Sequence, residues 1–345
     1  MLVKDSSFFS TIKKNKKILI LDLGFLGDTV HLIPAARIVR KAFIDSHITL
    51  MCAAHVAHLG GLVPWINSIL AYPRFPDRLP LWKDFAWLWR LYRGKYDLVI
   101  NLTGSQRSNY LSWATLAPVR LGRVAARPHF MRHVCFTHLV DFPFGTMHIA
   151  RQRYKLLLNL GFPDCGFAYD ITLPKASLRT IQGFSLPAGF VHISPFSNLD
   201  YKEMPISITA EWVNSFHKCY PFIPLVFSLA PTQREREKWD KLGPLITAPI
   251  TKVFKGDLSV LELAALISQA ALHVGGDSGA MHLAAIQDIP TVSRFREDPI
   301  NYTEWHPRGS KHRTLIGEAS PSGLIGISAE QILEACKDVM GEKKD

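Results

Sequence analysis

Short apolar runs alternate with amphipathic stretches along the chain, and this alternation predicts an α/β protein. Residues 17–23 (KILILDL) form a mostly apolar run after a cluster of lysines, which is typical of a buried strand. Beyond Gly27, the apolar positions Val30, Ile33 and Ile38 have the spacing of one helix face. Because such strand–turn–helix units recur, we expect parallel sheets covered by helices. The other predicted strands are residues 47–54, 96–102, 190–196, 222–230 and 271–276, and further helices are predicted over residues 208–220, 260–269 and 327–340.

The units fall into two series, separated by a stretch with several prolines and glycines, residues 161–189. The pattern therefore predicts two α/β halves with a hinge between them. Near the end of the chain, Ser328 and Gln331 have the spacing of a capping box at the start of the last helix. The expected organisation is a basic flexible tail over residues 1–17, a first domain over residues 18–175, a second over residues 176–326, and a terminal helix and tail over residues 327–345.

The composition adds a charge imbalance. The 345 residues include 40 Lys and Arg against 29 Asp and Glu, a net charge of +11, which favours anionic partners such as nucleotides, phosphorylated glycans, membrane surfaces or nucleic acids. Apolar residues make up 48%, which excludes a globally disordered chain. No apolar run approaches the roughly 18 residues of a membrane-spanning helix, and no secretion signal is evident, so we expect a cytoplasmic protein. The five cysteines form no C-x-x-C pair, which argues against a disulfide framework or a zinc ribbon.

Candidate chemistry begins at the turn after the first predicted strand, Gly24-Phe25-Leu26-Gly27-Asp28. Glycines allow a tight turn and a close approach of the backbone to a ligand, and a helix N-terminus favours anions. Two interpretations of Asp28 stay open. As an N-cap it would stabilise its own helix. As a general base it would face the ligand cleft at the carboxyl end of a parallel strand.

A second turn of this kind lies in VGGDSGAMHLAA (274–285). The backbone N–H groups of residues 278–280 and the helix dipole would form a seat for a diphosphate, with His282 one turn further on. The structural alternative is that Asp277 or Ser278 caps the helix and His282 packs inward. A strand, the sequence G-D-S-G-x-x-H and a helix in this order are more specific than a pair of glycines alone.

These segments resemble glycosyltransferase family 9, whose best-known members are the ADP-heptose:lipopolysaccharide heptosyltransferases. The resemblance spans residues 17 to about 316 and rests on ILILDLGFLGDTVHLIPAARIVRKAF, on KYDLVINLTGSQRSNYLSW followed by VRLGR, and on LSVLELAALISQAALHVGGDSGAMHLAAIQDIPTV. It implies the GT-B architecture, in which two Rossmann-like domains face each other across a cleft, the N-terminal one binding the acceptor and the C-terminal one the nucleotide sugar. The implied activity is transfer of a sugar, a heptose from ADP-heptose, to a lipopolysaccharide-core or related anionic glycan or glycolipid acceptor.

The resemblance also assigns roles to single residues. Asp28 matches the family's aspartate that is taken to be the catalytic base, and Lys202 in Y-K-E-M-P matches a lysine that contacts the donor's phosphates. Should Asp28 be only a cap, Asp22 is the next candidate base. The other implied donor-binding residues are Ser194, Leu258, Asp277, Ser278, Gly279 and His282, and acceptor contacts are expected at Gly27, Gln106, Arg107, Arg120 and Arg123.

The implied mechanism needs few groups. One carboxylate removes the proton of the acceptor hydroxyl as that hydroxyl attacks the anomeric carbon, and this single displacement inverts the anomeric centre. Lys202 and a helix N-terminus stabilise the departing diphosphate. No D-x-D motif occurs, so neither a metal ion nor another cofactor is expected. The sequence departs from the family at Asp22, where a basic residue is common, and at Phe295-Arg296, where the family has Phe-Gly; these departures leave the donor's identity open.

Two further segments combine basic residues with metal-ligating or aromatic ones. His129, His133, Cys135 and His138 are ligand types at helical spacing, but without a matching pair elsewhere a basic loop facing an anionic acceptor is favoured over zinc. The stripe WKDFAWLWRLYRGK (82–95) favours core packing with basic side chains extending outward. Peripheral docking on the anionic inner face of the cytoplasmic membrane is the alternative.

Two functions of other classes remain as alternatives to glycosyl transfer. A non-catalytic polyanion- or nucleic-acid-binding protein would use the charge of +11 and concentrate its basic residues on one face. A glycosyltransferase, by contrast, is not expected to bind nucleic acid. A sugar-nucleotide epimerase on the same fold would need additional acid and base groups facing the sugar, and the sequence contains no clear set of them.

Overall fold

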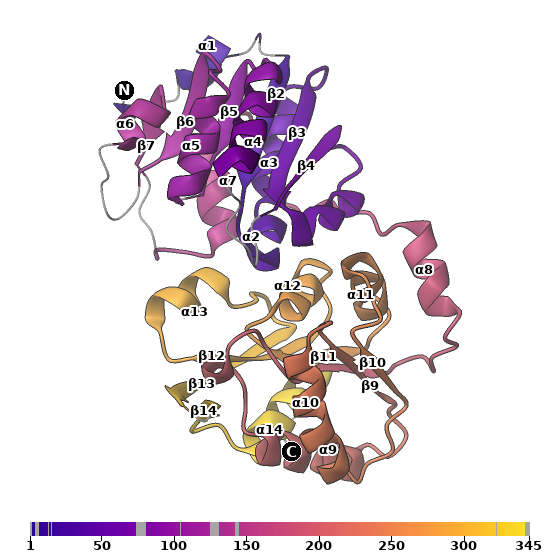
Figure 1. Ribbon diagram of the computed structural model, residues 1–345. Helices are drawn as coiled ribbons and strands as arrows, with labels where there is room; N and C mark the ends of the chain where they lie inside the picture. The colour runs from indigo at the N-terminus through magenta and orange to yellow at the C-terminus, as the bar shows by residue number, and fades with distance from the viewer. Residues whose placement is uncertain are drawn as a thin grey trace. The chain divides into compact units, whose positions relative to one another are not determined.

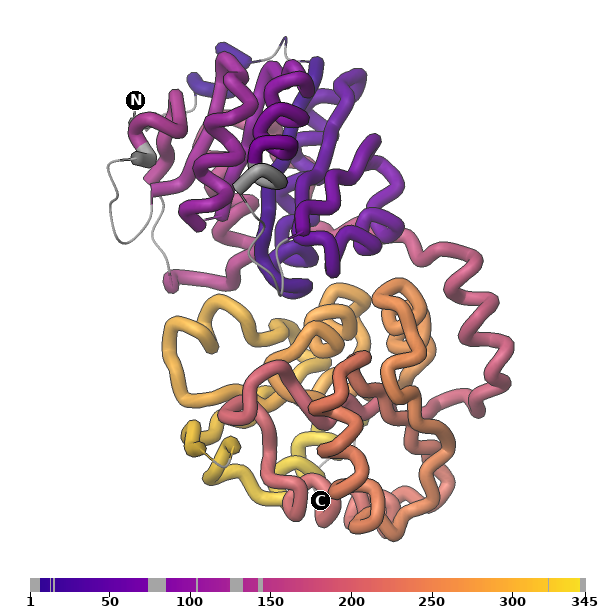
Figure 2. Tube along the Cα trace, in the orientation of Figure 1, coloured from indigo at the N-terminus to yellow at the C-terminus, as the bar shows by residue number. Residues whose placement is uncertain are grey.

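The chain is organised in two compact units, Met1–Thr172 and Leu173–Asp345. The computed structural model describes residues 2–3, 7–12, 14, 16–73, 81–103, 105–124, 131–141, 145–321 and 323–341. Each unit consists of one sheet with helices on both faces (Figure 1). Figure 2 follows the chain from the first unit through residues 161–174, which contain neither helix nor strand, into the first helix of the second unit.

One parallel sheet forms the centre of the first unit. Its described strands are β1 (Leu2–Val3), β2 (Lys17–Asp22), β3 (His47–Ala53), β4 (Ser68–Tyr72), β5 (Leu98–Asn101), β6 (Val119–Arg123) and β7 (His138–Val140), and their order across the sheet is β1-β7-β6-β5-β2-β3-β4. In β2 every residue after Lys17 is buried, as expected for a central strand that is covered on both faces. Because β2 and β5 are parallel neighbours, the turns that follow them lie at the same edge of the sheet.

Helices cover both faces of this sheet. They are α1 (Phe8–Ile12), α2 (Leu26–Val30), α3 (Ile33–Ala42), α4 (Leu81–Arg93), α5 (Gln106–Ala114), α6 (Met131–Cys135) and α7 (Ile149–Asn159), with the 3₁₀ helix η1 (Ala54–Leu62). In Figure 1, α4 and α5 cover the near face and α3 and α7 the far face. The helix α5 begins with Ser105 as its N-cap, whose hydroxyl accepts a hydrogen bond from the N–H of Ser108.

Part of the segment expected to be a flexible tail is folded. The strand β1 pairs with β7, and in α1 the side chains of Phe8 and Ile12 are buried. Phe9 packs against the rings of Phe43 and Phe162. The expectation of a flexible tail over residues 1–17 is thus corrected for residues 7–12. Burial of their apolar side chains stabilises the folded state, whereas the lysines nearby in the sequence had favoured an exposed tail.

The sheet of the second unit has the same plan with one reversed edge strand. Its described strands are β8 (Val191–Ser194), β9 (Leu225–Leu229), β10 (Lys252–Lys255), β11 (Leu272–Gly276), β12 (Thr291–Arg296), β13 (His312–Ser320) and β14 (Gly323–Ile325), in the order β10-β9-β8-β11-β12-β13-β14. Only the pairing of β13 with β14 is antiparallel among these strands. The end of β8 lies beside the end of β11, because Ser194 is in register with Gly275.

Two layers of helices enclose this second sheet (Figure 1). The helices are α8 (Lys175–Gln182), α9 (Ile206–Cys219), α10 (Gln233–Leu242), α11 (Val260–Ile267), α12 (Gly279–Ile286), α13 (Pro299–Trp305) and α14 (Ala329–Met340), with the 3₁₀ turns η2 (Asp200–Lys202) and η3 (Gly243–Leu245). Trp212, Trp239 and Ile332 place α9, α10 and α14 on one core, and Ile181 and Leu266 place α8 and α11 on another. The predicted α/β class and the capping box at the start of α14 are confirmed.

Candidate active site

The turn between β2 and α2 holds the Asp28 carboxylate against the backbone. The helix begins at Leu26, two residues earlier than predicted, so Phe25 is the N-cap residue and Asp28 is the third residue of the helix. Its Oδ2 atom accepts a hydrogen bond of 3.0 Å from the N–H of Phe25. A Cβ atom at Gly24 would lie 2.5 Å from this oxygen, so only glycine permits the arrangement. Asp28 thus stabilises its helix without being the cap residue, and its side chain remains 28% exposed.

A buried arginine joins Asp28 to a second carboxylate. Arg153 projects from α7, and its Nη2 atom lies 3.2 Å from Asp22 Oδ2 and 3.6 Å from Asp28 Oδ1. Its Nη1 atom donates a hydrogen bond to the Asp28 carbonyl at 2.5 Å. Asp22 is fully buried, and its other oxygen accepts from the N–H of Gly24. Asp22 thus links the turn to α7, and its burial and contacts do not favour the alternative prediction that it could replace Asp28 as the base.

In the second unit, the turn between β11 and α12 has the geometry of an anion-binding helix start. The strand ends at Gly276, Ser278 is the N-cap residue and α12 begins at Gly279. The Ser278 hydroxyl makes no capping hydrogen bond, and its buried Oγ atom has no hydrogen-bond partner among the described residues. Because a buried hydroxyl without a partner is costly, this oxygen is suited to a ligand that approaches the helix N-terminus.

The structure brings Lys202 to this turn, although 75 residues separate it from Asp277. Lys202 Nζ lies 2.6 Å from Asp277 Oδ2, and both side chains are mostly buried. His282 is 5% exposed, and its Nε2 atom is 3.8 Å from the other carboxylate oxygen of Asp277. Asn301, at the start of α13, reaches the same carboxylate at 3.5 Å. An ammonium, an imidazole and a helix N-terminus therefore meet at one point of the second unit.

The remaining predicted donor-binding residues lie at the same edge of this sheet. Ser194 is the last residue of β8 and is buried. Leu258 precedes α11 and packs partly buried against its core, and the next residue, Ser259, caps α11 in a capping box with Glu262. Gly275, which is in register with Ser194, could carry no side chain, because a Cβ atom would lie 2.7 Å from the ring of His273.

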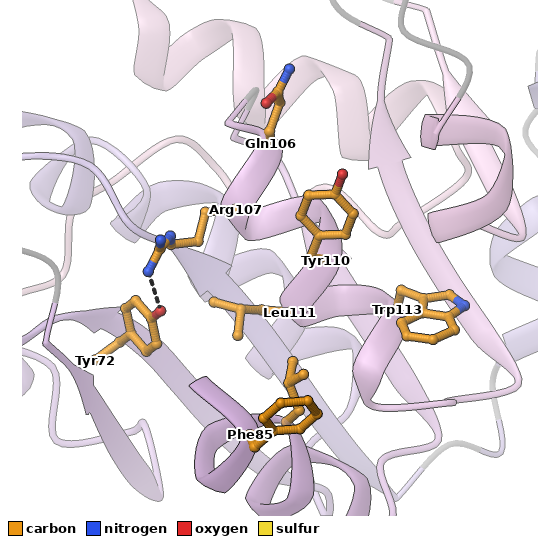
Figure 3. Close-up of a pocket in the computed structure, with 8 residues that line it drawn as sticks. Tyr72, Phe85, Gln106, Arg107, Tyr110, Leu111 and Trp113 are labelled. Atoms are coloured by element: carbon orange, nitrogen blue, oxygen red, sulfur yellow. Dashed lines mark hydrogen bonds between the residues drawn. The ribbon is translucent and has the colours of Figure 1, made fainter. Parts of the chain in front are cut away.

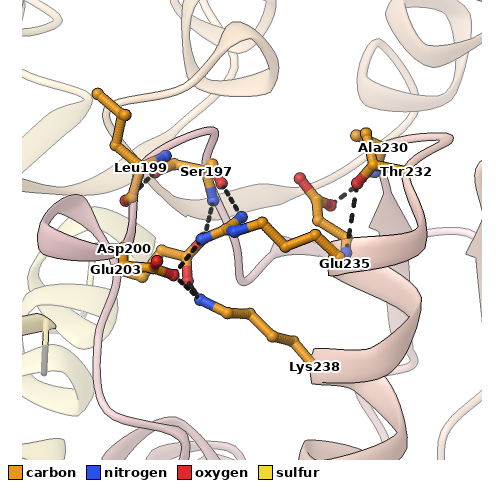
Figure 4. A network of polar contacts seen from close by, with 9 residues as sticks. Ser197, Leu199, Asp200, Glu203, Ala230, Thr232, Glu235 and Lys238 are labelled. Carbon is orange, nitrogen blue, oxygen red and sulfur yellow. Dashed lines mark hydrogen bonds and ion pairs between the residues drawn. The ribbon is translucent and has the colours of Figure 1, made fainter.

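An ion-pair network fixes the segment that carries Lys202 (Figure 4). Arg234, at the start of α10, donates to the Ser197 carbonyl at 2.6 Å and to Glu203 at 2.8 Å. Lys238, one turn later, pairs with Asp200 and Glu203. Hydrogen bonds from Lys238 and Arg234 lower the pKa of Asp200 to about 2. Since Asp200 and Glu203 flank Lys202 in the sequence, these contacts hold the η2 turn in place.

The Phe295-Arg296 departure lies next to the same turn. Arg296 pairs with Asp298 at 2.6 Å, and its guanidinium stands 5.4 Å from the centre of the Tyr201 ring. Phe295 itself is fully buried at the end of β12. The arginine therefore adds a cation and a contact with the ring of Tyr201, the residue before Lys202, and a glycine at this position would provide neither.

Comparison with known proteins identifies the family. The model of glycosyltransferase family 9 (heptosyltransferase) matches residues 86–322. The chain belongs to this family. It is similar to the lipopolysaccharide core heptosyltransferase OpsX of Haemophilus influenzae, with 23% identity over 282 residues that cover 81% of this chain and 79% of the relative. Of solved structures, the glycosyl transferase family 9 protein of Veillonella parvula matches with a TM-score of 0.79 and 22% identity over 95% and 98% of the two chains. The E. coli heptosyltransferase WaaC with ADP-2-deoxy-2-fluoro heptose matches with a TM-score of 0.72 and 18% identity over 93% and 99%.

Family membership decides between the alternative functions and confirms the GT-B fold class. A glycosyltransferase of family 9 is an enzyme, so the non-catalytic polyanion-binding protein and the sugar-nucleotide epimerase are set aside. The match includes the β11–α12 turn and Lys202 but begins after Asp28. The roles of the single residues therefore stay predictions.

The residues of this family 9 glycosyltransferase that were expected to bind the acceptor fall into two groups. Gln106 and Arg107 begin α5, at the carboxyl edge of the first sheet, and Gly27 is buried in α2 at the same edge. Arg120 and Arg123 have partners inside the unit instead. Arg120 donates to the carbonyls of Cys135 and Ala117, and Arg123 is 3% exposed and donates to Gln152. Acceptor contacts at these two arginines stay a prediction to which the structure adds no support.

The structure also bears on the predictions about metal sites and membrane-spanning helices. Within the described ranges, no group of three or more His, Cys, Asp and Glu side chains could hold a metal ion. His129, from the segment weighed as a zinc site, lies outside these ranges. None of the helices in the described part of the chain is both long and apolar enough to span a membrane.

Two sets of residues that contact these sites were not predicted from the sequence. Nothing near Arg153 in the sequence marks it as a partner of Asp22 and Asp28, which lie more than 120 residues away. Arg234 and Lys238 did carry a signal: they are basic residues one turn apart, in a helix that starts directly after a predicted strand. Basic residues in that position of an α/β unit lie at the edge of the sheet where ligands bind.

Proposed function

We propose that this family 9 glycosyltransferase transfers a heptose from ADP-heptose to a lipopolysaccharide-core or related glycan acceptor, with inversion at the anomeric carbon. The observation that carries the proposal is the meeting of Lys202 with Asp277 at the N-terminus of α12, in a chain whose family is that of the heptosyltransferases. The donor's identity is supported by the relatives, one of which is named for heptosyl transfer to the lipopolysaccharide core and one of which holds an ADP-heptose analogue.

In the second unit, we propose that the N-terminus of α12 and Lys202 bind the diphosphate of the donor. Backbone N–H groups and the helix dipole attract negative charge at this end of a helix. The Ser278 hydroxyl, buried and without a partner among the described residues, can donate a further hydrogen bond. As the glycosidic bond breaks, negative charge grows on the departing diphosphate, and the ammonium and the helix N-terminus stabilise it electrostatically. Ser194, Leu258, Gly279 and His282 complete the proposed donor site.

In the first unit, we propose that Asp28 accepts the proton of the acceptor hydroxyl. One of its oxygens is held by the N–H of Phe25, and Arg153 lies 3.6 Å from the other. These two contacts limit the rotation of the carboxylate, while its partial exposure leaves it accessible to a substrate. Proton removal and attack at the anomeric carbon then occur in one displacement, and no covalent sugar–enzyme intermediate forms.

We also propose that the protein acts in the cytoplasm and contacts the inner face of the cytoplasmic membrane peripherally. The supporting observation is the exposed side of α4, where Phe85 and Trp89 are 70% and 61% exposed beside Arg90 and Arg93. Aromatic rings with neighbouring cations favour the interface of an anionic membrane.

The donor assignment is tested by calorimetric titration of ADP, UDP and GDP into the protein and into Lys202→Ala. We expect ADP to bind most tightly and Lys202→Ala to weaken its binding by about 1–3 kcal/mol, the scale of a hydrogen bond to a charged group. Lys241→Ala, which removes an exposed lysine from α10 of the same unit, serves as the matched control and should bind ADP as the unmodified protein does. Unchanged ADP affinity in folded Lys202→Ala would remove Lys202 from the donor site.

A further inference from the structure

A cavity of about 440 Å³ opens between α4, α5 and β4 of the first unit. This volume falls within the range of pockets that hold one small molecule, roughly 300–1,000 Å³. Its walls are mainly apolar and aromatic, and Figure 3 shows the side chains from the helices converging on it. The lining residues are Tyr72, Phe85, Leu88, Gln106, Arg107, Tyr110, Leu111 and Trp113.

A polar contact between two side chains lies in the wall of this cavity. Arg107 extends toward β4 and donates a hydrogen bond of 2.8 Å to the Tyr72 hydroxyl (Figure 3). Tyr72 is itself fully buried, so this contact fixes the guanidinium in the wall of the cavity. A guanidinium in such a place is suited to bind a phosphate or carboxylate in a forked geometry.

Aromatic surface is exposed at three residues that line the cavity, Phe85, Tyr110 and Trp113, and at Trp89, which follows Phe85 by one helical turn on α4. Phe85 and Trp89 lie four residues apart on α4, and Tyr110 and Trp113 lie three apart on α5, so each pair shares one helix face. All four side chains are exposed. On an ordinary protein surface exposed apolar side chains are scattered singly, whereas here four exposed rings lie on two adjacent helices. Rings that are apolar with a polar edge are typical of protein surfaces at a membrane interface.

We propose that this cavity, which we call the α4–α5 pocket, binds one acyl chain of an anionic membrane lipid. The chain would lie against Leu88, Leu111 and the aromatic rings, the lipid phosphate would pair with Arg107, and Phe85 and Trp89 would enter the headgroup layer. The pocket would thereby hold the first unit at the membrane through a single lipid. This inference deepens the proposed peripheral membrane contact, but binding at the pocket depends on neither the donor site nor Asp28.

Alkyl phosphates of six to twelve carbons, kept below the concentration at which they form micelles, test the pocket by calorimetry on the full chain. Each further methylene buried in an apolar pocket should raise the affinity about fourfold. Leu88→Trp places a ring in the pocket and should abolish this dependence. Ile44→Trp adds the same ring to an exposed position outside the pocket and should leave it intact. Affinity that does not change with chain length, or equal binding by Leu88→Trp, would overturn the proposal.

The anionic part has a test of its own. Arg107→Met keeps the apolar stem and removes the guanidinium, so it should lose most of the preference for decyl phosphate over decyl glucoside and retain the chain-length dependence. If the unmodified protein binds both compounds equally, no phosphate site exists at Arg107. Co-sedimentation with vesicles of phosphatidylglycerol, which contain no glycan acceptor, should fall at least several-fold in Leu88→Trp relative to Ile44→Trp.

Two results would assign the pocket to another occupant and so contradict the proposal. Binding of alkyl phosphates without any binding to phosphatidylglycerol vesicles would exclude a membrane lipid as their source. A dimer that appears in light scattering and that Leu88→Trp dissociates would show that a second copy of the chain covers the pocket. Neither result changes the donor site or Asp28, and heptosyl transfer is measured separately with ADP-heptose. The proposal for the pocket can therefore be refuted while the proposed function is supported, and the proposed function can be refuted while lipid binding at the pocket is supported.

Discussion

The buried ion pair beneath the Asp28 turn makes a quantitative prediction about stability. Replacing Arg153 by methionine keeps the apolar stem of the side chain and removes its charge. Asp22 would then remain fully buried without the guanidinium that lies 3.2 Å from it. Removing one partner of a buried ion pair costs about 3–5 kcal/mol, because the remaining charge is left uncompensated in a medium of low dielectric constant. The hydrogen bond to the Asp28 carbonyl is lost as well.

A double-mutant cycle separates the ion pair from other effects of the substitution. Asp22→Asn removes the charge and keeps an oxygen that can accept from the N–H of Gly24. The combined Asp22→Asn and Arg153→Met variant should therefore be destabilised by about 0.5–3 kcal/mol less than the sum of the two single variants, the range of coupling between contacting residues. Urea unfolding followed by circular dichroism gives each free energy by linear extrapolation.

Arg151 provides the matched control on the same helix. Its guanidinium lies 4.4 Å from the centre of the Phe167 ring and is exposed, so Arg151→Met should cost only about 0.5–1 kcal/mol. If Arg153→Met costs no more than Arg151→Met, or if the double-mutant cycle shows no coupling, then Arg153 does not compensate Asp22. In that case the account of how Asp28 is held in place is wrong.

Two further predictions concern the second unit. His192 hydrogen-bonds to His273 and Ser228, and burial lowers its pKa to about 3. Below pH 6.5 the unfolded chain therefore binds a proton that the folded chain does not, so the free energy of unfolding decreases as the pH is lowered. The unmodified protein loses unfolding free energy between pH 7 and pH 5, and His192→Leu should lose about 2 kcal/mol less over the same interval. If urea titrations at the two pH values show the same loss for both proteins, His192 is not neutral in the folded protein. Arg234→Met, which frees the η2 turn, should weaken ADP binding in calorimetry by about 1–3 kcal/mol, whereas equal ADP affinity would show that the network does not position Lys202.

Local patterns predicted the backbone elements well, and for a physical reason. A central parallel strand is buried on both faces, so β2 and β11 appear in the sequence as apolar runs wherever they are placed in the sheet. Each of these two strands differs from its predicted range by one residue at one end. The turns after them were also located, because glycine and aspartate are restricted to few backbone positions.

The same patterns did not show how side chains meet. The pairing of Lys202 with Asp277 depends on the contact of η2 with β12, the strand that pairs with β11. Only the resemblance to a known family indicated beforehand that both residues belong to one site. Arg153 reaches Asp22 and Asp28 because α7 packs on α3, which follows directly on α2. Contacts of this kind are decided by the packing of whole elements rather than by spacing along the chain. The burial of Phe8 and Ile12, which lie in a lysine-rich part of the sequence, has the same origin.

The most direct test of the proposed mechanism is the turnover of Asp28→Asn with ADP-heptose and a lipopolysaccharide-core acceptor, with ADP binding and unfolding measured on the same sample. Asparagine keeps an oxygen that can accept from the N–H of Phe25, so the helix start and the ADP affinity should be retained. Loss of a general base lowers the rate by a factor of about 10²–10⁴, and we expect a loss of that size. Transfer at a rate near that of the unmodified protein would show that Asp28 only stabilises its helix and that another group removes the proton.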